Sequence, residues 1–371
     1  ILPATFDEME ADVHMPERLG VYQSVGDTAG PGGIMRAQRT IPMFVEIAEA
    51  IEKYAPDAWV INYTNPMSVC VKTLYHVFPK IKAFGCCHEV FGTQKVLMGI
   101  LNQSGIAKAE NFHDIKINVL GINHFTWFDA ASYKGIDLFP IYRKYIEEHF
   151  EEGFYGKGEF DPNNTFECKN RVKFDLFMKY GLIAAAGDRH LAEFMPGDLY
   201  LKDPETVKSW NFGLTTVSWR KKDLEKRLAK SRELVEGKPL ELKETGEEGV
   251  ALIRAICGLQ DVISNVNLPN TARQISNLPE TAVVETNAYF GRDCVRPIYA
   301  GDLDEKVKTL VMPHIDNHER TLKAAIDGDR QYLYEAFKHD PLIRGRISEA
   351  SSMKLADDML EATKKYLPKY F

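Results

Sequence analysis

A thiol and an imidazole each follow a short apolar run in this chain. Cys87 and His88 come just after Lys82–Phe84, and Asn123 and His124 come just after residues 115–120 (IKINVL). Strands that end this way deliver their last residues to one rim of a parallel sheet, where open α/β folds bind ligands. A thiolate and an imidazole at one rim could hold a single metal ion. The alternative is a buried free cysteine and a hydrogen-bonded core histidine, and the spacing alone favours it.

Asparagine closes another apolar run, at residues 62–66 (NYTNP). The amide of Asn65 could donate to a substrate hydroxyl or carbonyl beside a nicotinamide ring, as in folds of the malate and lactate dehydrogenase type. An ordinary Asn-Pro turn explains the same letters equally well.

An acid, a cation and an imidazole stand together at Asp188, Arg189 and His190, after a run of small residues. Asp188 could serve as a general base, and Arg189 could clamp a substrate carboxylate with its planar fork. A helix capped by an aspartate is an equal alternative. Asp27 lies in a glycine-rich loop over residues 20–33 without a cation beside it in sequence, so it could be only a turn residue.

The elements that would position these groups alternate over the first 125 residues. Because strands and helices take turns, a parallel sheet with right-handed crossovers is expected. We predict an α/β fold in which residues 1–125 form the second half of a Rossmann-type, doubly wound sheet. The expected elements are a helix at 34–54, a strand at 58–61, a helix at 67–78, a strand at 82–86, a helix at 89–101 and a strand at 115–120.

Residues 126–371 are less regular and predict an α+β domain for substrate binding and oligomerisation. Its expected elements are a helix at 172–180, a charged helix and hinge at 221–248, an apolar helix at 251–263, a strand at 283–289 and amphipathic helices over 306–366.

Composition excludes several classes of protein. A net charge of −7 among 371 residues argues against a nucleic-acid partner. No run of about 18 apolar residues exists, so no membrane span is expected. Six cysteines, two of them adjacent, do not form a disulfide framework, and a reducing cytoplasmic location is expected.

Taken together, these pieces resemble glycoside hydrolase family 4, the NAD- and metal-dependent glycosidases. The resemblance spans almost the whole chain and looks closest to the α-galacturonidases of that family. It is carried by five groups of residues in the family's order: Gln23–Thr28 with Gly32–Ile34 and Arg36, then Asn62–Pro66, then Cys87–His88 with Gly92, then Gly121–His124, then Gly187–Asp188 followed by Asn267, Asn277–Pro279 and Val284–Glu285.

The resemblance implies roles for individual residues. Cys87 and His124 would ligate a divalent metal ion, usually Mn²⁺, with substrate and water oxygens completing its shell. Asp27 or His88 would be the general acid, and Asp188 the base near sugar C2. The remaining contacts would be Asn65, Asn123, Arg36, Arg189 and His190 with the substrate, and Leu2, Pro3, Thr64 and Asn65 with NAD.

The implied reaction is hydrolysis of an α-galacturonide through redox, elimination and addition. NAD⁺ would oxidise C3, a base would take the C2 proton, the aglycone would leave, and water would add. The alternatives are an α-glucuronidase or other family 4 glycosidase, a 2-hydroxy acid dehydrogenase of the malate dehydrogenase type, and a non-catalytic ligand-binding protein. A uronic acid glycoside as ligand and a homo-oligomer (dimer or tetramer) are also expected.

The resemblance also implies that the first half of the Rossmann domain, with its glycine-rich phosphate-binding turn, lies upstream of Ile1. These expectations therefore concern the complete protein.

Overall fold

The structure, a computed structural model, describes residues 6–156, 158–240 and 248–371. Leu2 and Pro3, two of the predicted NAD contacts, lie outside the described residues. Within the described part, every helix is too short or too polar to cross a lipid bilayer. Its α-helices are α1 (Phe6–Glu17), α2 (Gly30–Tyr54), α3 (Met67–Val77), α4 (Glu89–Ser104), α5 (Phe139–His149), α6 (Arg171–Tyr180), α7 (Asp188–Phe194), α8 (Pro204–Ser209), α9 (Val217–Val235), α10 (Gly249–Ile256), α11 (Glu305–Asp327), α12 (Arg330–His339) and α13 (Glu349–Ala362).

The first sheet combines early and late parts of the chain. Its strands, in spatial order, are β1 (Trp59–Asn62), β2 (Lys82–Gly85), β7 (Val262–Pro269), β8 (Val283–Gly291) and β9 (Cys294–Pro297). β1 and β2 are parallel and joined by α3, which confirms the predicted strand–helix–strand unit. β7 then pairs antiparallel with β2, through Gly85 and Asn267. The edge of β2 is therefore completed by a hairpin from far along the chain.

The second sheet is antiparallel, which corrects one prediction. It contains β3 (Lys116–Ile122), β4 (Phe125–Tyr133), β5 (Ile136–Asp137) and β6 (Ile183–Ala184). The strand predicted at 115–120 was expected to extend the parallel sheet, but it pairs with β4 instead. Gly121 (φ 131°) and His124 (φ 64°) form a tight turn that folds β4 straight back onto β3. The position beside β2 is already taken by β7.

One predicted helix is too long. The apolar run at 251–263 forms α10 only as far as Ile256, and β7 begins at Val262. Gly258 adopts φ 77°, a left-handed conformation that ends the helix. The β-branched Val262 and Ile263 then favour a strand.

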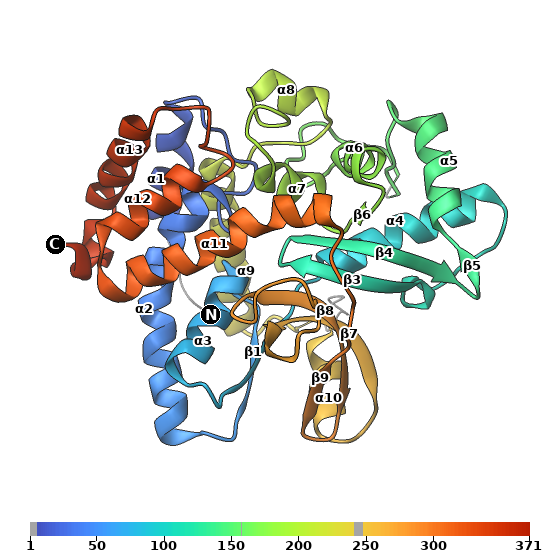
Figure 1. The fold of residues 1–371 in the computed structure, drawn as a ribbon, viewed down its shortest axis with the longest axis horizontal. Helices are drawn as coiled ribbons and strands as arrows, with labels where there is room; N and C mark the ends of the chain where they lie inside the picture. Colours follow the sequence, from blue (N-terminus) through green and yellow to red (C-terminus); the bar gives the residue numbers. More distant parts are fainter. Residues whose placement is uncertain (1–5, 157, 241–247) are drawn as a thin grey trace.

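The helices surround the sheets in groups that Figure 1 separates clearly. α1, α2, α12 and α13 lie on the left with α11, while α4 and α5 lie on the right beside β3 and β4. The long helix α2 packs against both α3 and α11, so it connects the parallel strands to the C-terminal helices. Before α2 the chain folds back so closely that a Cβ on Gly33 would lie 2.4 Å from the carbonyl carbon of Thr28. Glycine at this position lets the loop that carries Asp27 lie against the helix.

Candidate active site

Four separate segments meet where β2 and β3 end. The imidazole of His124, in the turn after β3, lies 3.2 Å from the hydroxyl of Thr28 in the loop before α2 (Nδ1 to Oγ1). The ring of His190, in the first turn of α7, lies 3.9 Å from the ring of His124 between centroids. The backbone N–H of Gly187 donates to Glu89, the residue two after Cys87 (2.8 Å). Strand ends far apart in sequence therefore meet at one place.

Burial disfavours the charged forms of the paired imidazoles of His124 and His190. Burial, and then the neighbouring His190, lower the pKa of His124 to about 3, although Glu89 and Asp27 act in the opposite direction. Burial likewise lowers the pKa of His190. A neutral imidazole keeps a lone pair for a metal ion, so the state of His124 suits the role of ligand.

Glu89 is a site residue that the sequence analysis did not select. Its Oε1 lies 3.9 Å from the Nε2 atoms of both His88 and His190. Burial raises its pKa, but His190 and His124 outweigh that effect and bring it to about 2. Glu89 is therefore an ionised carboxylate among imidazoles. An acidic residue in the first turn of a helix is common, so the sequence carried no distinctive signal.

Asp27 is the second ionised carboxylate of the cluster. Burial raises its pKa, but Arg36, then His190 and His124, lower it to about 2. Thr28 donates its hydroxyl to Asp27 Oδ1 (2.7 Å) and also contacts His124. Asp27 is therefore more than a turn residue, and α2 supplies the nearby cation that its local sequence lacks.

Cys87 lies on the same rim as His124. Its thiol accepts hydrogen bonds from the Asn123 side chain and from the backbone of Glu89, while burial, Glu285 and Glu89 raise its pKa. Cys87 and His124 therefore share two neighbours. Asn123 precedes His124 and contacts the Cys87 thiol, and Glu89 acts electrostatically on both side chains. Among the described residues, no three histidine, cysteine or acidic side chains are grouped to hold a metal ion. A metal ion here would take two ligands from these residues and the rest from smaller molecules.

Asp188 makes its hydrogen bonds at the start of α6. Its carboxylate Oδ1 accepts from the backbone N–H of Lys173 (3.1 Å), and the N–H groups of Arg171 and Val172 also point to it. It therefore caps α6, whose own N-cap residue Asn170 makes no side-chain cap. Burial raises the pKa of Asp188 to about 6. Oδ1 faces α6, whereas Oδ2 is buried without a hydrogen-bond partner among the described residues, so the role of Asp188 as a base stays a prediction.

Arg189 is also largely committed to the protein. Its Nε donates to the carbonyl of Ser24 (3.1 Å), and its Nη2 donates to the same carbonyl and to the Thr215 hydroxyl. The guanidinium carbon lies 4.8 Å from the centre of the Phe166 ring. Two of its nitrogens therefore already bind neutral acceptors, and its role as a clamp for a substrate carboxylate stays a prediction.

The turn after β1 presents an unsatisfied oxygen. Asn62 holds the turn through both its amide groups, one to the Thr64 N–H and one to the Thr64 carbonyl, each 3.0 Å. Arg36 Nε donates to the backbone carbonyl of Asn65 (3.2 Å). Asn65 Oδ1 is buried and finds no hydrogen-bond partner within the described parts of the chain. A buried acceptor of this kind fits a donor from a bound ligand.

Two family models match the chain. Residues 1–103 match the family 4 glycosyl hydrolase model, and residues 119–343 match the model of the family 4 glycosyl hydrolase C-terminal domain. The chain belongs to glycosyl hydrolase family 4. The resemblance inferred from the motifs is thereby confirmed. The division predicted at residue 125 stays a prediction, since the first sheet joins strands from both sides of it.

Named relatives within family 4 are close. The chain is 67% identical over 370 residues to an alpha-galacturonidase of Lachnoclostridium phytofermentans, covering 100% of this chain and 79% of the relative. It is 51% identical over 362 residues to an alpha-galacturonidase of Bacillus subtilis, covering 97% and 80%.

Solved structures confirm the predicted α/β fold class. The crystal structure of lplD from Bacillus subtilis matches with a TM-score of 0.92 at 51% identity, covering 97% of this chain and 82% of that one. A 6-phospho-alpha-glucosidase from gut microorganisms, solved with NAD and Mn²⁺, has a TM-score of 0.78 at 20% identity, covering 99% and 80%. The second likeness shows the shared fold alone.

A buried carboxyl group on β8 supports the metal ligand predicted in this family 4 chain. Glu285 Oε1 accepts from the Asn265 amide (2.6 Å), which also donates to the carbonyl of Cys87 (3.1 Å). Glu285 Oε2 accepts from Asn123 (3.5 Å), whose side chain contacts the Cys87 thiol. Glu285 therefore fixes two amides that hold Cys87.

Replacing Glu285 with glutamine should weaken binding of Mn²⁺ by about 10–100-fold, the usual loss when a residue that orients a ligand is removed. The NH₂ group of the glutamine would face the amide donors of Asn123 or Asn265, where the carboxylate of Glu285 offers an acceptor. Titration of free Mn²⁺ by electron paramagnetic resonance measures the affinity directly. Glu280→Gln is the matched control, since that exposed residue pairs with Arg273 on the surface. Equal affinities for the two variants would rule out this role for Glu285.

Glu193 makes stability depend on pH. Its Oε1 accepts from the N–H groups of Val25 (2.6 Å) and Gly26 (2.8 Å), yet burial raises its pKa from 4.5 to about 8. The folded protein thus keeps a proton that the unfolded chain loses between these values. The free energy of unfolding therefore falls as pH rises from about 4.5 to 8.

Glu193→Gln should flatten this decline by an amount on the order of a few kcal/mol, because glutamine carries no titrating proton. We expect the variant to match the parent near pH 5 and to melt at a higher temperature near pH 8. Melting temperatures recorded across that range test it. The free energy of unfolding of the variant should still fall somewhat as pH rises, because burial raises the pKa of Asp340 to about 7 and this group also titrates in the range. Parallel curves for the two proteins would contradict the expectation.

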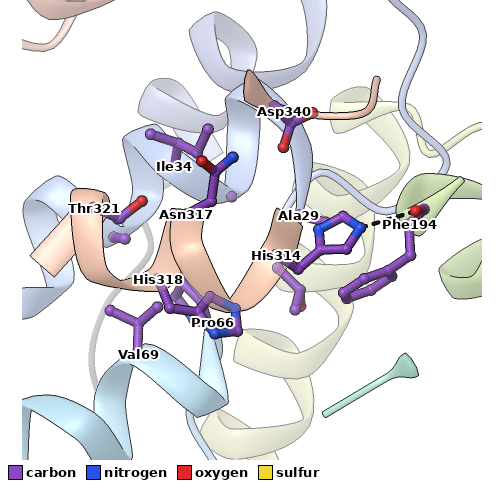
Figure 2. A pocket seen from close by; sticks show the side chains of 13 residues that line it. Ala29, Ile34, Pro66, Val69, Phe194, His314, Asn317, His318, Thr321 and Asp340 are labelled. Carbon is purple, nitrogen blue, oxygen red and sulfur yellow. Dashed lines mark hydrogen bonds between the residues drawn. The ribbon is translucent and has the colours of Figure 1, made fainter. Parts of the chain in front are cut away.

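A small cavity lies behind Thr28, away from Cys87. Figure 2 shows His314 and His318 of α11 beside it, with a dashed hydrogen bond from the His314 ring to the carbonyl of Phe194 (2.8 Å). Its free volume of about 20 Å³ accommodates about one water molecule. It is therefore too small for a sugar.

Proposed function

We propose that this family 4 chain belongs to an α-galacturonidase that uses NAD and a divalent metal ion. The observation that carries the proposal is the meeting of Cys87 and His124 beside Glu89, in a chain 67% identical to a protein named alpha-galacturonidase. A homo-oligomeric state and a cytoplasmic location belong to the same proposal.

The donor set fits a metal ion that also binds substrate. Cys87 offers a sulfur that accepts hydrogen bonds from Asn123 and the Glu89 N–H; burial and then Glu285 and Glu89 raise the pKa of its thiol, so a cation would be needed to hold the thiolate. His124 offers a neutral imidazole oriented by Thr28. Two protein ligands leave the other positions to sugar and water oxygens, as Mn²⁺ prefers.

The site also fits a sugar beside a nicotinamide ring. The unpaired Oδ1 of Asn65 can accept from a sugar hydroxyl or from the nicotinamide amide, and Thr64 lies in the same turn. When bound, NAD⁺ would accept hydride from sugar C3, and the metal ion would polarise the C3 oxygen.

The charges of the chain's own residues support a proposal for the proton steps. Glu89 is ionised and can take the proton from C2, which is acidic beside an oxidised C3. Asp27 is also ionised at neutral pH and so has no proton to give. His88, whose side chain is 63% exposed beside Glu89, is therefore the proposed acid toward the leaving group.

An excess of positively charged side chains near Asp27 supports the proposal that the substrate is an acidic sugar. Arg36 and Arg220 both interact electrostatically with Asp27, and Arg189 lies close by. The other nearby acid, Glu193, has its pKa raised by burial to about 8, so Asp27 is the ionised carboxylate among these three guanidinium groups and another negative charge can be accommodated. The carboxylate of a uronic acid would supply it.

Incubating the complete protein with 4-nitrophenyl α-galacturonide, with and without NAD⁺ and Mn²⁺, tests the proposal. Release of 4-nitrophenol only when both are present is the expected result. The α-glucuronide, assayed in parallel, should react at a lower rate.

The other outcomes separate the alternatives. Accumulation of NADH with a small hydroxy acid would indicate a dehydrogenase of the malate dehydrogenase type. Absence of turnover with every substrate under reducing conditions would indicate a ligand-binding protein. Either result would overturn the proposed function.

A further inference from the structure

Lys173 is a buried lysine that the proposed proton steps do not use. It lies in the first turn of α6, and only 2% of its surface is exposed. Lysine is almost never fully buried unless the protein pairs its charge. Burial lowers the pKa of Lys173, and the neighbouring Asp188, Cys168 and Glu89 act in the opposite direction. A lysine in this place is therefore explained only by contacts that an apolar side chain could not make.

Lys173 connects two helices that carry proposed catalytic groups. Its backbone N–H donates to Asp188 Oδ1 at the start of α7 (3.1 Å), and its Nζ donates to Thr93 Oγ1 in α4 (2.8 Å). Figure 1 shows α6 beside both of these helices. α7 carries His190, and α4 begins with Glu89, whose Oε1 lies 3.9 Å from His190 Nε2. Lys173 thus links the supports of both groups.

Thr93 extends this link to the segment before α7. Its hydroxyl donates to the carbonyl of Ala185 (2.6 Å), and Lys173 donates to the same hydroxyl oxygen. Glu89 lies one turn earlier on the same face of α4, and its Oε2 accepts from the N–H of Gly187 (2.8 Å). Two side chains of α4 therefore bind backbone groups two residues apart, and Lys173 fixes one of them.

From these contacts we propose that Lys173 is a positioning residue for the glycosidase reaction. The inference rests on the proposed function. Lys173 is buried away from the substrate, and it holds α4 against the segment before α7 so that the Glu89 carboxylate stays aimed at the sugar C2 beside His190. A base must lie within hydrogen-bond reach of the proton that it removes, so a small displacement of this carboxylate lowers the rate.

Lys173→Met removes the donor and nearly keeps the length of the side chain. It should lower turnover of an α-galacturonide and exchange of the C2 proton by about 10–100-fold. The affinity for Mn²⁺ should stay that of the parent, because the hydrogen bonds of Lys173 do not involve Cys87 or His124. Lys179→Met is the matched control and should behave as the parent, since Lys179 pairs with Asp175 at the surface of the same helix (2.6 Å). Equal turnover in the two variants, or lost Mn²⁺ affinity in Lys173→Met, would overturn the proposal.

Coupling to Glu89 separates a positioning role from a general loss of stability. Once Glu89→Gln has removed the proposed base, adding Lys173→Met should lower turnover little further, whereas the losses of two independent substitutions would multiply. Turnover of the single and double variants, measured at saturating NAD⁺ and Mn²⁺, gives this comparison. Multiplied losses would show that Lys173 does not act through Glu89.

Hydrogen exchange of the Gly187 amide tests the link without turnover, so failure of the proposed function can be told apart from failure of this inference. That amide donates to Glu89, and its exchange should become about tenfold faster in Lys173→Met, because the carboxylate is no longer held in place. Thr93→Val, which removes the hydroxyl that Lys173 binds, gives the same test if Lys173→Met folds poorly. Faster exchange in a protein that hydrolyses no galacturonide would support the link and reject only the proposed function. Exchange at the parent's rate in a folded Lys173→Met protein would reject the role of Lys173.

Discussion

Replacing Cys87 with alanine should remove the bound metal ion and lower turnover of an α-galacturonide by about 10³-fold or more. The substitution deletes one of two proposed protein ligands, and stabilisation of developing negative charge by a metal ion is worth several kcal/mol. The neighbouring amides of Asn123 and Asn265 would remain, but neither replaces a thiolate. Metal content after gel filtration, measured by mass spectrometry, and the rate with saturating NAD⁺ provide two independent readouts.

Cys86→Ala is the matched control, because it removes the adjacent sulfur. Cys86 is buried in an apolar cluster with Phe84 and Val266, which accounts for its side chain without a metal ion. We expect this variant to keep its metal and to lose only some stability. Full retention of Mn²⁺ by Cys87→Ala would show that the thiol is not a ligand.

Replacing Glu89 with glutamine should lower turnover by about 10²–10⁴-fold, the usual contribution of a positioned acid or base. Glutamine keeps the size of the side chain and can still accept the N–H of Gly187, so the fold should be preserved. Exchange of the substrate C2 proton with deuterated solvent reports the base directly. That exchange should stop in Glu89→Gln while NAD⁺ still binds.

Asp188→Asn is the informative partner, because the sequence alone assigned the base to Asp188. The structure predicts that this variant loses about 1–3 kcal/mol of stability, since a buried carboxylate that caps α6 is weakened. Its exchange at C2 should continue in the fraction that remains folded. A stable Asp188→Asn protein without C2 exchange would return the role to Asp188 and remove it from Glu89.

The secondary structure that the sequence predicted well has strong local signals. The helices now seen as α2, α3, α4 and α6 follow apolar residues at helical spacing, with glycine or proline near their starts or ends. The errors occur where the position of a strand depends on pairing with a strand far away in the sequence. β3 was assigned to the parallel sheet because nothing local reveals that β7, over 170 residues later, occupies the place beside β2.

The residues of the candidate site fall into the same two groups, those indicated by the local sequence and those that only tertiary contacts reveal. Cys87 and His124 were candidates because each follows a predicted strand, and the resemblance to family 4 added Asp27. The structure places Asp27 and His124 on either side of Thr28, and Cys87 against Asn123. Glu89, Glu285 and Arg220 were missed. Each looks like an ordinary helix or strand residue until another element approaches it.

By itself, the sequence determined the family and the residue types that can bind a metal ion and move protons, because these lie in short motifs with fixed spacing. Only the tertiary structure decided which carboxylates face the imidazoles. Asp188 and Glu89 are both acids in the first turn of a helix, but one carboxylate caps α6 and the other lies among three histidines. Charge state and role depend on burial and on neighbours within a few ångströms, and folding alone sets those.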